Sequence, residues 1–257
     1  MSQLQSSNPP DELTPPAEML HDGSSSQEEF ASLGENFTSF VLIPRTHLPS
    51  TGAVLDIGCG NGAVARALTR FLAPAGRYAG VDINARTVAW LQERYRSYPN
   101  FSFAHANVWN KLYNPAGQYQ AAEYSFPFDD ASFDVVLLKS VFTHMLPRDV
   151  RAYLREVSRV LKSGGRAMIS YFLLNPESIA LIDKGLDAHK VTFDYEGDTL
   201  CRVCNPEIPE AVTAHDERRI RGFYAEVGMQ VVELAFGDWS GRATLLGHQD
   251  LVVAIKI

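Results

Sequence analysis

A glycine-rich turn beside a carboxylate is the feature of this sequence best suited to bind a small molecule. Residues 54–62 (VLDIGCGNG) run from a short apolar segment through Asp56 to Gly58, Gly60 and Gly62. Glycine lets a backbone turn tightly and lie directly against a ligand. In open α/β sheets, nucleotides bind where such a turn joins the carboxyl end of a strand to a helix. The segment therefore predicts a nucleotide-like ligand at this turn.

The charge at the turn narrows the ligand class. Asp56 places a negative charge at its mouth, and residues 56–62 contain no lysine or arginine. That charge repels a phosphate but not S-adenosylmethionine (SAM), which carries an ammonium and a sulfonium. The spacing of Gly58, Gly60 and Ala63 also fits the dinucleotide fingerprint. We favour SAM because an acid beside a pyrophosphate is unfavourable and no later segment suggests a nicotinamide site.

A second carboxylate, Asp82, ends the next apolar segment. A carboxylate at this place can accept hydrogen bonds from both hydroxyls of a ribose. Its alternative role is that of an acid at a helix N-terminus, where the helix dipole favours negative charge. Cys59, between two glycines, is expected to be a small space-filling residue and not a nucleophile.

Strand and helix patterns alternate along the chain and must position these residues. Apolar segments predict strands at 54–57, 77–83, 101–107, 133–140, 166–173, 229–237 and 250–257. Periodic apolar residues predict helices at 28–41, 61–72, from 85, at 150–161 (ended by Gly164 and Gly165) and at 216–227. The alternation predicts an α/β fold with a doubly wound, Rossmann-like, mostly parallel seven-stranded sheet. The last two strands have no helix between them, so the final strand should run antiparallel.

Three segments do not fit this alternation. Residues 1–27 are rich in Ser, Pro and Gln, and we expect a disordered N-terminal tail. Residues 28–257 should form one domain, in which insertions at 108–132 and 175–214 cap the site on its substrate side. Cys201 and Cys204 resemble half of a zinc site, but without a second pair we predict no metal.

Composition limits the partners and the compartment. The formal net charge of −7 argues against a general nucleic-acid binder. No apolar run reaches membrane-spanning length, and the N-terminus lacks a signal-peptide pattern. The three cysteines do not form a disulfide framework. We therefore expect a cytoplasmic protein with neither a nucleic-acid nor a membrane partner. The oligomeric state is not indicated.

Four motifs occur in the order that is typical of one enzyme superfamily. DIGCGNG (56–62), VDIN (81–84), FDVVLLKSVFTHM (133–145) and VLKSGGRAMI (160–169) resemble those of class I SAM-dependent methyltransferases. The resemblance covers roughly residues 30–257. Within the superfamily, the loop NKLYNPAGQYQAAEYSFPFDD and the tail GDWSGRATLLGHQD are similar to a bacterial branch that acts on small metabolites.

The resemblance implies SAM as the cofactor and a set of residues that hold it. These are Asp56, Gly58, Cys59, Gly60, Asp82, Ile83, Asn107, Val108 and Lys139. Asn107 departs from the family pattern, since members often have an aspartate there that meets the adenine amine. The carbonyl of asparagine can accept the same hydrogen bond.

Methyl transfer to a hydroxyl requires a base. The reaction is an in-line displacement, so the protein mainly aligns the acceptor and excludes water. A base must remove the hydroxyl proton, and histidine suits that role near neutral pH. His144, just past the fourth strand, and His248, before the last strand, are the candidates. Each has an alternative: His144 can hydrogen-bond its local turn, and residues 238–250 can be an ordinary exposed hairpin.

The antiparallel ending returns residues 238–250 to the carboxyl edge of the sheet. There Trp239, Arg242 and Gln249 combine an aromatic ring with polar groups, which suits a sugar or another hydroxylated acceptor. Tyr171 is expected to wall the same pocket, although an aromatic at this place can equally be core. The sequence thus predicts transfer of a methyl group to a hydroxyl oxygen of a small molecule. An N-methyltransferase and a SAM-binding regulatory subunit without turnover are the open alternatives.

Overall fold

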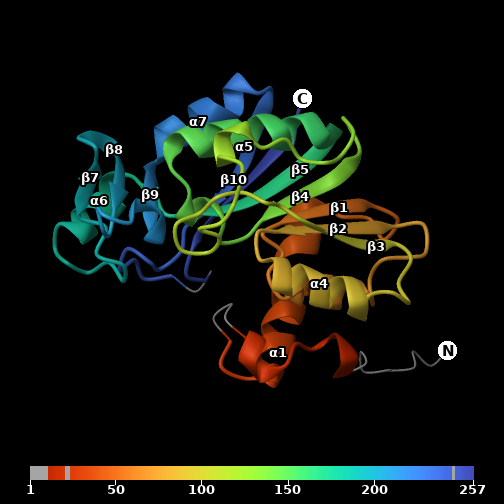
Figure 1. Cartoon of the computed structure of the whole chain (residues 1–257). Coiled ribbons are helices and arrows are strands. Elements are labelled where there is room, and N and C mark those ends of the chain that lie inside the picture. The colour runs from red at the N-terminus through yellow and green to blue at the C-terminus, as the bar shows by residue number, and fades with distance from the viewer. Residues whose placement is uncertain (1–10, 21–23, 245–246) are drawn as a thin grey trace.

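A seven-stranded sheet forms the centre of the structure (Figure 1). The computed structural model describes residues 11–20, 24–244 and 247–257. In spatial order the strands are β3 (Phe101–His105), β2 (Arg77–Asp82), β1 (Ala53–Ile57), β4 (Phe133–Leu138), β5 (Leu161–Tyr171), β11 (Asp250–Lys256) and β10 (Met229–Ala235). The strands from β3 to β5 are parallel, and β11 is antiparallel to both of its neighbours. The predicted Rossmann-like sheet with an antiparallel last strand is confirmed.

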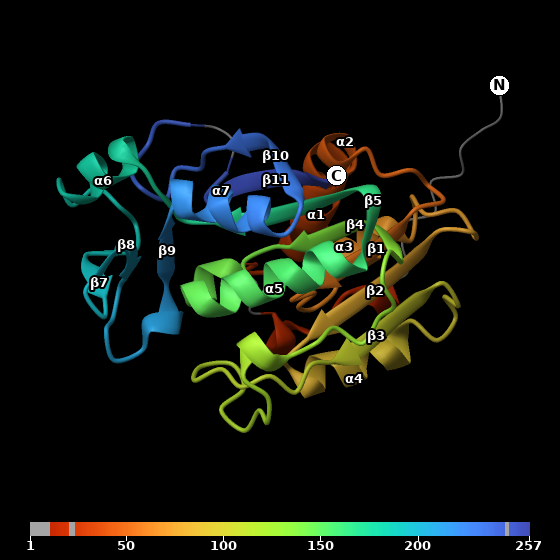
Figure 2. The ribbon, with the colours of Figure 1, turned by 90° about the horizontal axis from the view of Figure 1, so that it is seen from above.

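Helices cover both faces of this sheet. Figures 1 and 2 show α5 (Pro147–Val160) and α7 (Glu217–Glu226) on one face. Figure 1 shows α1 (Gln27–Phe37) and α4 (Ala85–Arg94) on the other. The remaining helices of the sheet domain are the π-helical turn η3 (Thr38–Leu42), α2 (Ile43–Thr46) and α3 (Ala63–Leu68). None of the helices in the described ranges is long and apolar enough to cross a membrane.

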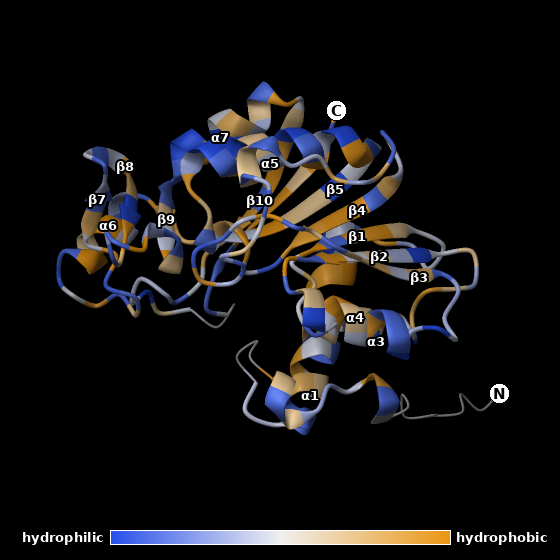
Figure 3. Cartoon of the chain, viewed as in Figure 1, coloured by the Kyte–Doolittle hydropathy of each residue, from blue (hydrophilic) through white to orange (hydrophobic). Residues whose placement is uncertain are grey.

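The central strands are apolar because they are buried on both faces (Figure 3). Successive residues of β1 belong to different clusters: Leu55 packs with α5 and α7, whereas Val54 packs with residues of α3 and α4. The same alternation recurs in β4 with Val136 and Val135. With both faces covered, the carboxyl edge of the parallel strands is the place left for a ligand.

A small second sheet follows β5 and lies at one side of the central sheet (Figure 1). Its strands are β6 (Leu173–Leu174), β9 (Thr213–Asp216), β8 (Asp198–Val203) and β7 (Phe193–Tyr195), in that spatial order, and α6 (Pro176–Ile182) precedes β7. The predicted insertion at 175–214 therefore has secondary structure of its own, because the β8–β9 and β7–β8 pairs are antiparallel and local.

The N-terminal segment is more ordered than its composition predicted. Leu13, in the 3-10 turn η1 (Asp11–Leu13), is 1% exposed and joins the apolar cluster that contains Leu42 and Leu48. Met19 is also buried, and its carbonyl accepts a hydrogen bond from Asn61. The expectation of a tail disordered through residue 27 is corrected for residues 11–20; residues 1–10 and 21–23 lie outside the described residues.

The predicted end of the helix at 150–161 is also corrected. We expected Gly164 and Gly165 to end it, but α5 ends at Val160 and β5 begins at the next residue. Gly164 has a φ of +77° inside β5, where the pairing with β4 shifts register between Phe133 and Val135. The glycines therefore accommodate an irregularity at the start of the strand and do not cap the helix.

Candidate active site

A cavity of about 1090 Å³ opens where β1, β2 and β4 end. Pockets that hold one drug-sized ligand measure roughly 300–1,000 Å³, so this cavity is at the upper end of that range. We name its two ends by their linings. The cofactor half comprises Phe30, Leu33, Gly34, Phe37, Asp56, Gly58, Cys59, Gly60, Asp82, Ile83, Asn84, Thr87 and Val108. The acceptor half comprises Trp109, Asn110, Tyr113, Tyr124, Phe126, His144, Met145, Arg148, Asp149, Tyr153, Tyr195 and Glu210.

The glycine turn is held tightly against β2. The amides of Gly58 and Cys59 both donate to the carbonyl of Val81, at 2.7 and 3.1 Å. Gly58 has a φ of +75°, and a Cβ on it would lie 2.4 Å from Cγ2 of Val141. Only glycine fits this position without strain. At Gly58 the turn therefore presents backbone to the cofactor half.

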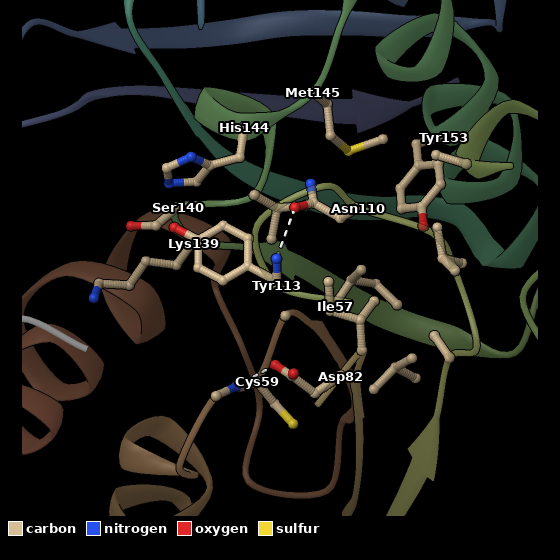
Figure 4. Close-up of a pocket in the computed structure, with 18 of the residues that line it drawn as sticks. Ile57, Cys59, Asp82, Asn110, Tyr113, Lys139, Ser140, His144, Met145 and Tyr153 are labelled. Atoms are coloured by element: carbon tan, nitrogen blue, oxygen red, sulfur yellow. Dashed lines mark hydrogen bonds between the residues drawn. The ribbon is translucent and has the colours of Figure 1, made fainter. Parts of the chain in front are cut away.

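Two carboxylates flank the turn. Asp82 accepts hydrogen bonds from the amide of Gly60 at its Oδ2 (2.9 Å) and from the amide of Asn84 at its Oδ1 (2.8 Å). Asp56 is 2% exposed and accepts from the hydroxyl of Tyr78 at 2.7 Å. Each carboxylate oxygen has two lone pairs, so Asp82 can accept from a ligand as well as from these amides. Figure 4 shows its side chain at the cavity.

The loop after β4 lies between the two halves. Lys139 and Ser140 both line the cavity, and the ammonium of Lys139 lies 5.5 Å from the ring centroid of Phe37. The hydroxyl of Ser140 donates to Oε1 of Gln249 at 3.1 Å. The structure thus brings the sequence-predicted residues Lys139 and Gln249 to the cavity, together with Ile83 and Val108.

His144 lies in the acceptor half (Figure 4). Its Nδ1 is 3.1 Å from the carbonyl oxygen of Glu210. A carbonyl only accepts, so Nδ1 carries the proton and Nε2 carries the lone pair of the neutral ring. Burial lowers the pKa of His144, although the backbone carbonyls of Glu210 and Ala211 act in the opposite direction. The ring is therefore neutral near pH 7, as a general base must be.

Aromatic side chains dominate the acceptor half, and sequence reasoning missed most of them. They are Trp109, Tyr113, Tyr124, Phe126, Tyr153 and Tyr195. Tyr113 packs edge-to-face on His144, with the ring centroids 5.3 Å apart. Tyr153 belongs to the periodic stripe of α5, which indicated only core packing. No local motif distinguishes these residues, because they come from a loop, helix α5 and strand β7.

Several residues that we expected at the acceptor lie elsewhere, beside the small sheet. The ring of Trp239 is fully buried and donates to the carboxylate of Asp250 at 2.7 Å. Arg242 donates to Glu177 at 2.8 Å. Asp250 also accepts from the amides of Leu173 and Gly237. This buried carboxylate fastens the segment to the small sheet, so Trp239 and Arg242 do not line the cavity.

His248 is a further correction. Its Nε2 is 2.7 Å from Nε2 of His189, and its Nδ1 is 2.8 Å from Asp238. These contacts hold the ring outside the lining of the cavity, so the structure offers no support for His248 as a base.

Two more of the expected residues are not among those that line the cavity. Tyr171 is fully buried, and its hydroxyl exchanges a 2.9 Å hydrogen bond with that of Tyr224. It belongs to the core and not to the pocket wall. Asn107 is also outside the lining; its backbone carbonyl accepts hydrogen bonds from the amides of Gln118 and Tyr119 and so anchors the 108–132 loop.

The cysteines carry no metal site in the described part of the chain. Cys201 is buried and Cys204 half-buried, both as free thiols. Burial raises the pKa of Cys201 to about 12, so this thiol is protonated and unreactive near neutral pH. Among the described side chains, no group of three or more His, Cys, Asp and Glu is placed to hold a metal ion.

Comparison with known proteins identifies the central part of the chain. Residues 55–169 match the family model described as a methyltransferase domain. The chain is 37% identical over 121 residues to the phthiotriol/phenolphthiotriol dimycocerosates methyltransferase 1 of Mycobacterium ulcerans, which covers 47% of this chain and 38% of that protein. It is 29% identical over 119 residues to the demethylmenaquinone methyltransferase of Tropheryma whipplei, which covers 46% of this chain and 41% of that protein. The matches thus span well under half the length of these curated relatives.

The fold is also that of solved methyltransferases. A SAM-dependent methyltransferase of Methanosarcina mazei superimposes with a TM-score of 0.58 at 21% identity, over 85% of this chain and 98% of that one. At this identity the likeness concerns the fold alone. Together with the family match, it confirms the predicted superfamily.

The residues of the cofactor half fit SAM, which this family uses. Asp82 is a fixed carboxylate suited to a ribose diol, and Asp56 offers negative charge where an ammonium or sulfonium is favoured. The glycine turn lets a ligand approach the backbone closely. These three features are those on which the sequence prediction of SAM depended.

Proposed function

Because the chain carries a class I SAM-dependent methyltransferase domain, we propose that it transfers the methyl group of SAM to a hydroxyl oxygen of a small molecule with an apolar or aromatic body. SAM supplies an activated methyl group on a positively charged sulfur. Asp82, Asp56 and the turn at Gly58 would hold it in the cofactor half, and Ile83, Val108 and Lys139 would complete that site.

The lining of the acceptor half supports an acceptor of this kind. Its aromatic rings and Met145 favour contact with an apolar or planar body. The two curated relatives are named for phthiotriol/phenolphthiotriol dimycocerosates and for demethylmenaquinone. A small lipid-like or quinone-like acceptor agrees with both observations.

The single observation that carries oxygen transfer is the state of His144. The Glu210 carbonyl fixes the proton on Nδ1, so Nε2 is the basic nitrogen of a ring that lines the acceptor half. Nε2 would remove the proton of the acceptor hydroxyl as the oxygen attacks the methyl carbon, and the proton would remain on the imidazolium until it passes to solvent. An amine acceptor would need this base less.

Three segments outside the core strands would close the site. Helix α1 contributes Phe30, Leu33, Gly34 and Phe37 to the cofactor half, and a Cβ on Gly34 would lie 2.5 Å from the carbonyl of Ala63. This close approach packs α1 directly on α3. The loop 108–132 and the insertion 175–214 would form the cap on the acceptor side and exclude water. A cytoplasmic location without nucleic-acid or membrane partners stays a prediction.

Substitution of His144 tests the proposed base. With methyl-labelled SAM and a small-molecule extract of the source cells, His144→Ala should slow label transfer about 10²–10⁴-fold. Its affinity for SAM should stay within about twofold, since His144 lies outside the cofactor half. His47→Asn is the matched control, because His47 is exposed and its φ of +53° is one that asparagine tolerates. Equal rates for His144→Ala and the control would refute the base.

A further inference from the structure

The hydroxyl of Tyr153 has no hydrogen-bond partner among the described residues, although its side chain is buried. Tyr153 is 5% exposed and lines the acceptor half. Its ring is fixed by Phe126, edge-to-face at 5.1 Å, and by Phe142. Figure 4 shows the hydroxyl directed into the cavity, away from the helix. The hydroxyl oxygen is not among the fully buried polar atoms without a partner, so it is accessible from the cavity and a ligand there can hydrogen-bond to it.

Asp149 lies beside Tyr153 on the same face of α5. The two residues are four positions apart, one helical turn, and both line the acceptor half. Burial raises the pKa of Asp149, while the charge of Arg148 and a hydrogen bond from the backbone of Ala122 oppose that shift. Arg148 is exposed, and no ion pair joins it to Asp149 in the described structure.

Glu210 brings a second carboxylate to the same place from the 3-10 turn η6 (Pro209–Ala211). Its Oε2 is buried and accepts no hydrogen bond from any described residue. Its charge also raises the pKa of Asp149, so the two carboxylates oppose each other across the acceptor half. By contrast, Asp198, which lines the cavity too, is neutralised by Arg219 at 3.0 Å.

These three groups together require a donor-rich, cationic ligand. Two carboxylates and one hydroxyl offer mainly acceptors, and an ammonium, with three donors and no acceptor, complements them. It also offsets the repulsion between Asp149 and Glu210. On the basis of the proposed function, we propose that the acceptor carries a protonated amine besides the hydroxyl to be methylated, and that the amine binds between Asp149, Tyr153 and Glu210.

The placement also accounts for specificity. The backbone carbonyl of Glu210 orients His144, while its side chain belongs to the amine subsite. One residue of the insertion thus fixes both the base and the charged end of the acceptor. An acceptor with the hydroxyl but without the amine would leave the buried Oε2 of Glu210 unpaired, which is costly.

A matched pair of phenols tests this proposal. Tyramine and tyrosol share a phenol and a two-carbon chain and differ only in an ammonium or a hydroxyl at its end. With the protein saturated by S-adenosylhomocysteine at pH 7, ligand-observed NMR should give tyramine at least tenfold the affinity of tyrosol. Equal binding of the two, or no binding of either, would overturn the proposal.

Substitutions test whether Asp149, Glu210 and Tyr153 cause the preference for tyramine. Asp149→Asn combined with Glu210→Gln should reduce the tyramine preference below threefold, and Tyr153→Phe should reduce it partly while keeping the ring contacts. Asp129→Asn is the control, because Asp129 is an exposed carboxylate outside the cavity lining. A preference that survives the double variant would also overturn the proposal. Failure to bind S-adenosylhomocysteine would instead contradict the proposed function, so the two failures are distinct.

Discussion

The two halves of the cavity are built in different ways. The cofactor half is made chiefly at the ends of β1 and β2, where a short glycine turn and Asp82 are fastened by hydrogen bonds to their own neighbours in the sheet. The acceptor half is assembled from a loop, one face of α5 and the small second sheet, which are far apart in the sequence. The glycine turn and Asp82 are therefore positioned by hydrogen bonds between neighbouring strands, whereas the acceptor half depends on packing between distant segments.

This difference shows how one fold can keep the same cofactor site while its acceptor site varies from protein to protein. The geometry for the cofactor follows from backbone turns that tolerate few substitutions, as the 2.4 Å approach at Gly58 illustrates. The acceptor side consists of side chains on insertions that can change without disturbing the sheet. Perturbations of the two halves should consequently have separable effects on cofactor affinity and on transfer.

The largest effect within the cofactor half is expected at Asp82. Asp82→Ala removes the carboxylate proposed to accept two ribose hydroxyls, and hydrogen bonds to charged groups contribute about 1.5–3 kcal/mol each. The Kd for SAM, measured by calorimetry, should rise about a hundredfold or more. Asp129→Ala serves as the control. An unchanged Kd would show that the cofactor lies elsewhere, and the division of the cavity into a cofactor half and an acceptor half would be wrong.

Substitution in the N-terminal segment tests whether residues 11–13 contribute to the stability of the fold. Leu13→Ala should lower the free energy of unfolding by about 2–3 kcal/mol, because Leu13 is 1% exposed in a packed cluster. Leu112→Ala, at a position that is 45% exposed, should cost little. Urea titration measures both. Equal, small losses would mean that residues 11–13 are not part of the core.

The acceptor side should be the more sensitive to acid. Complete burial lowers the pKa of His215, in β9, to about 4, although hydrogen bonds to backbone carbonyls act in the opposite direction. The unfolded chain binds this proton near pH 6.5, so stability is highest above pH 6.5 and falls as the pH drops toward 4. The wild type should lose about 2 kcal/mol between pH 7 and pH 5 through this group.

A variant without the imidazole isolates that contribution. His215→Gln keeps a donor for the carbonyl of Phe142, to which Nε2 of His215 is 3.1 Å away. Its stability should change less between pH 7 and pH 5 than that of the wild type, in parallel denaturation curves. Identical slopes would place the acid-sensitive group outside the small sheet.

How well the sequence predicted each region depends on whether its residues are positioned by local or by distant contacts. The apolar pattern of the strands, the spacing of the glycines and the acid at the end of β2 are local signals. They predicted that the last strand runs antiparallel, and they predicted the cavity residues Asp56, Asp82 and Gly58. Burial of Leu13 had no local signal, because its partners Leu42 and Leu48 are about thirty residues away.

The errors at the acceptor side have a shared physical cause. The buried carboxylate of Asp250 draws Trp239 and the segment after it onto the small sheet, so residues predicted from their place near the sheet edge are turned away. Conversely, Tyr153 and Asp149 face the cavity from a helix whose apolar period indicated only packing. Such side-chain directions depend on contacts between distant segments, which one sequence does not reveal.

The identity of the atom that receives the methyl group distinguishes oxygen transfer from the alternatives. The protein, SAM labelled with ¹³C at the methyl group and a small-molecule extract of the source cells would be incubated together, and the labelled product analysed by NMR and mass spectrometry. We expect a single new O-methyl ether, formed at a rate that falls with His144→Ala. A label on nitrogen or carbon, or an ether formed equally fast by His144→Ala, would contradict it.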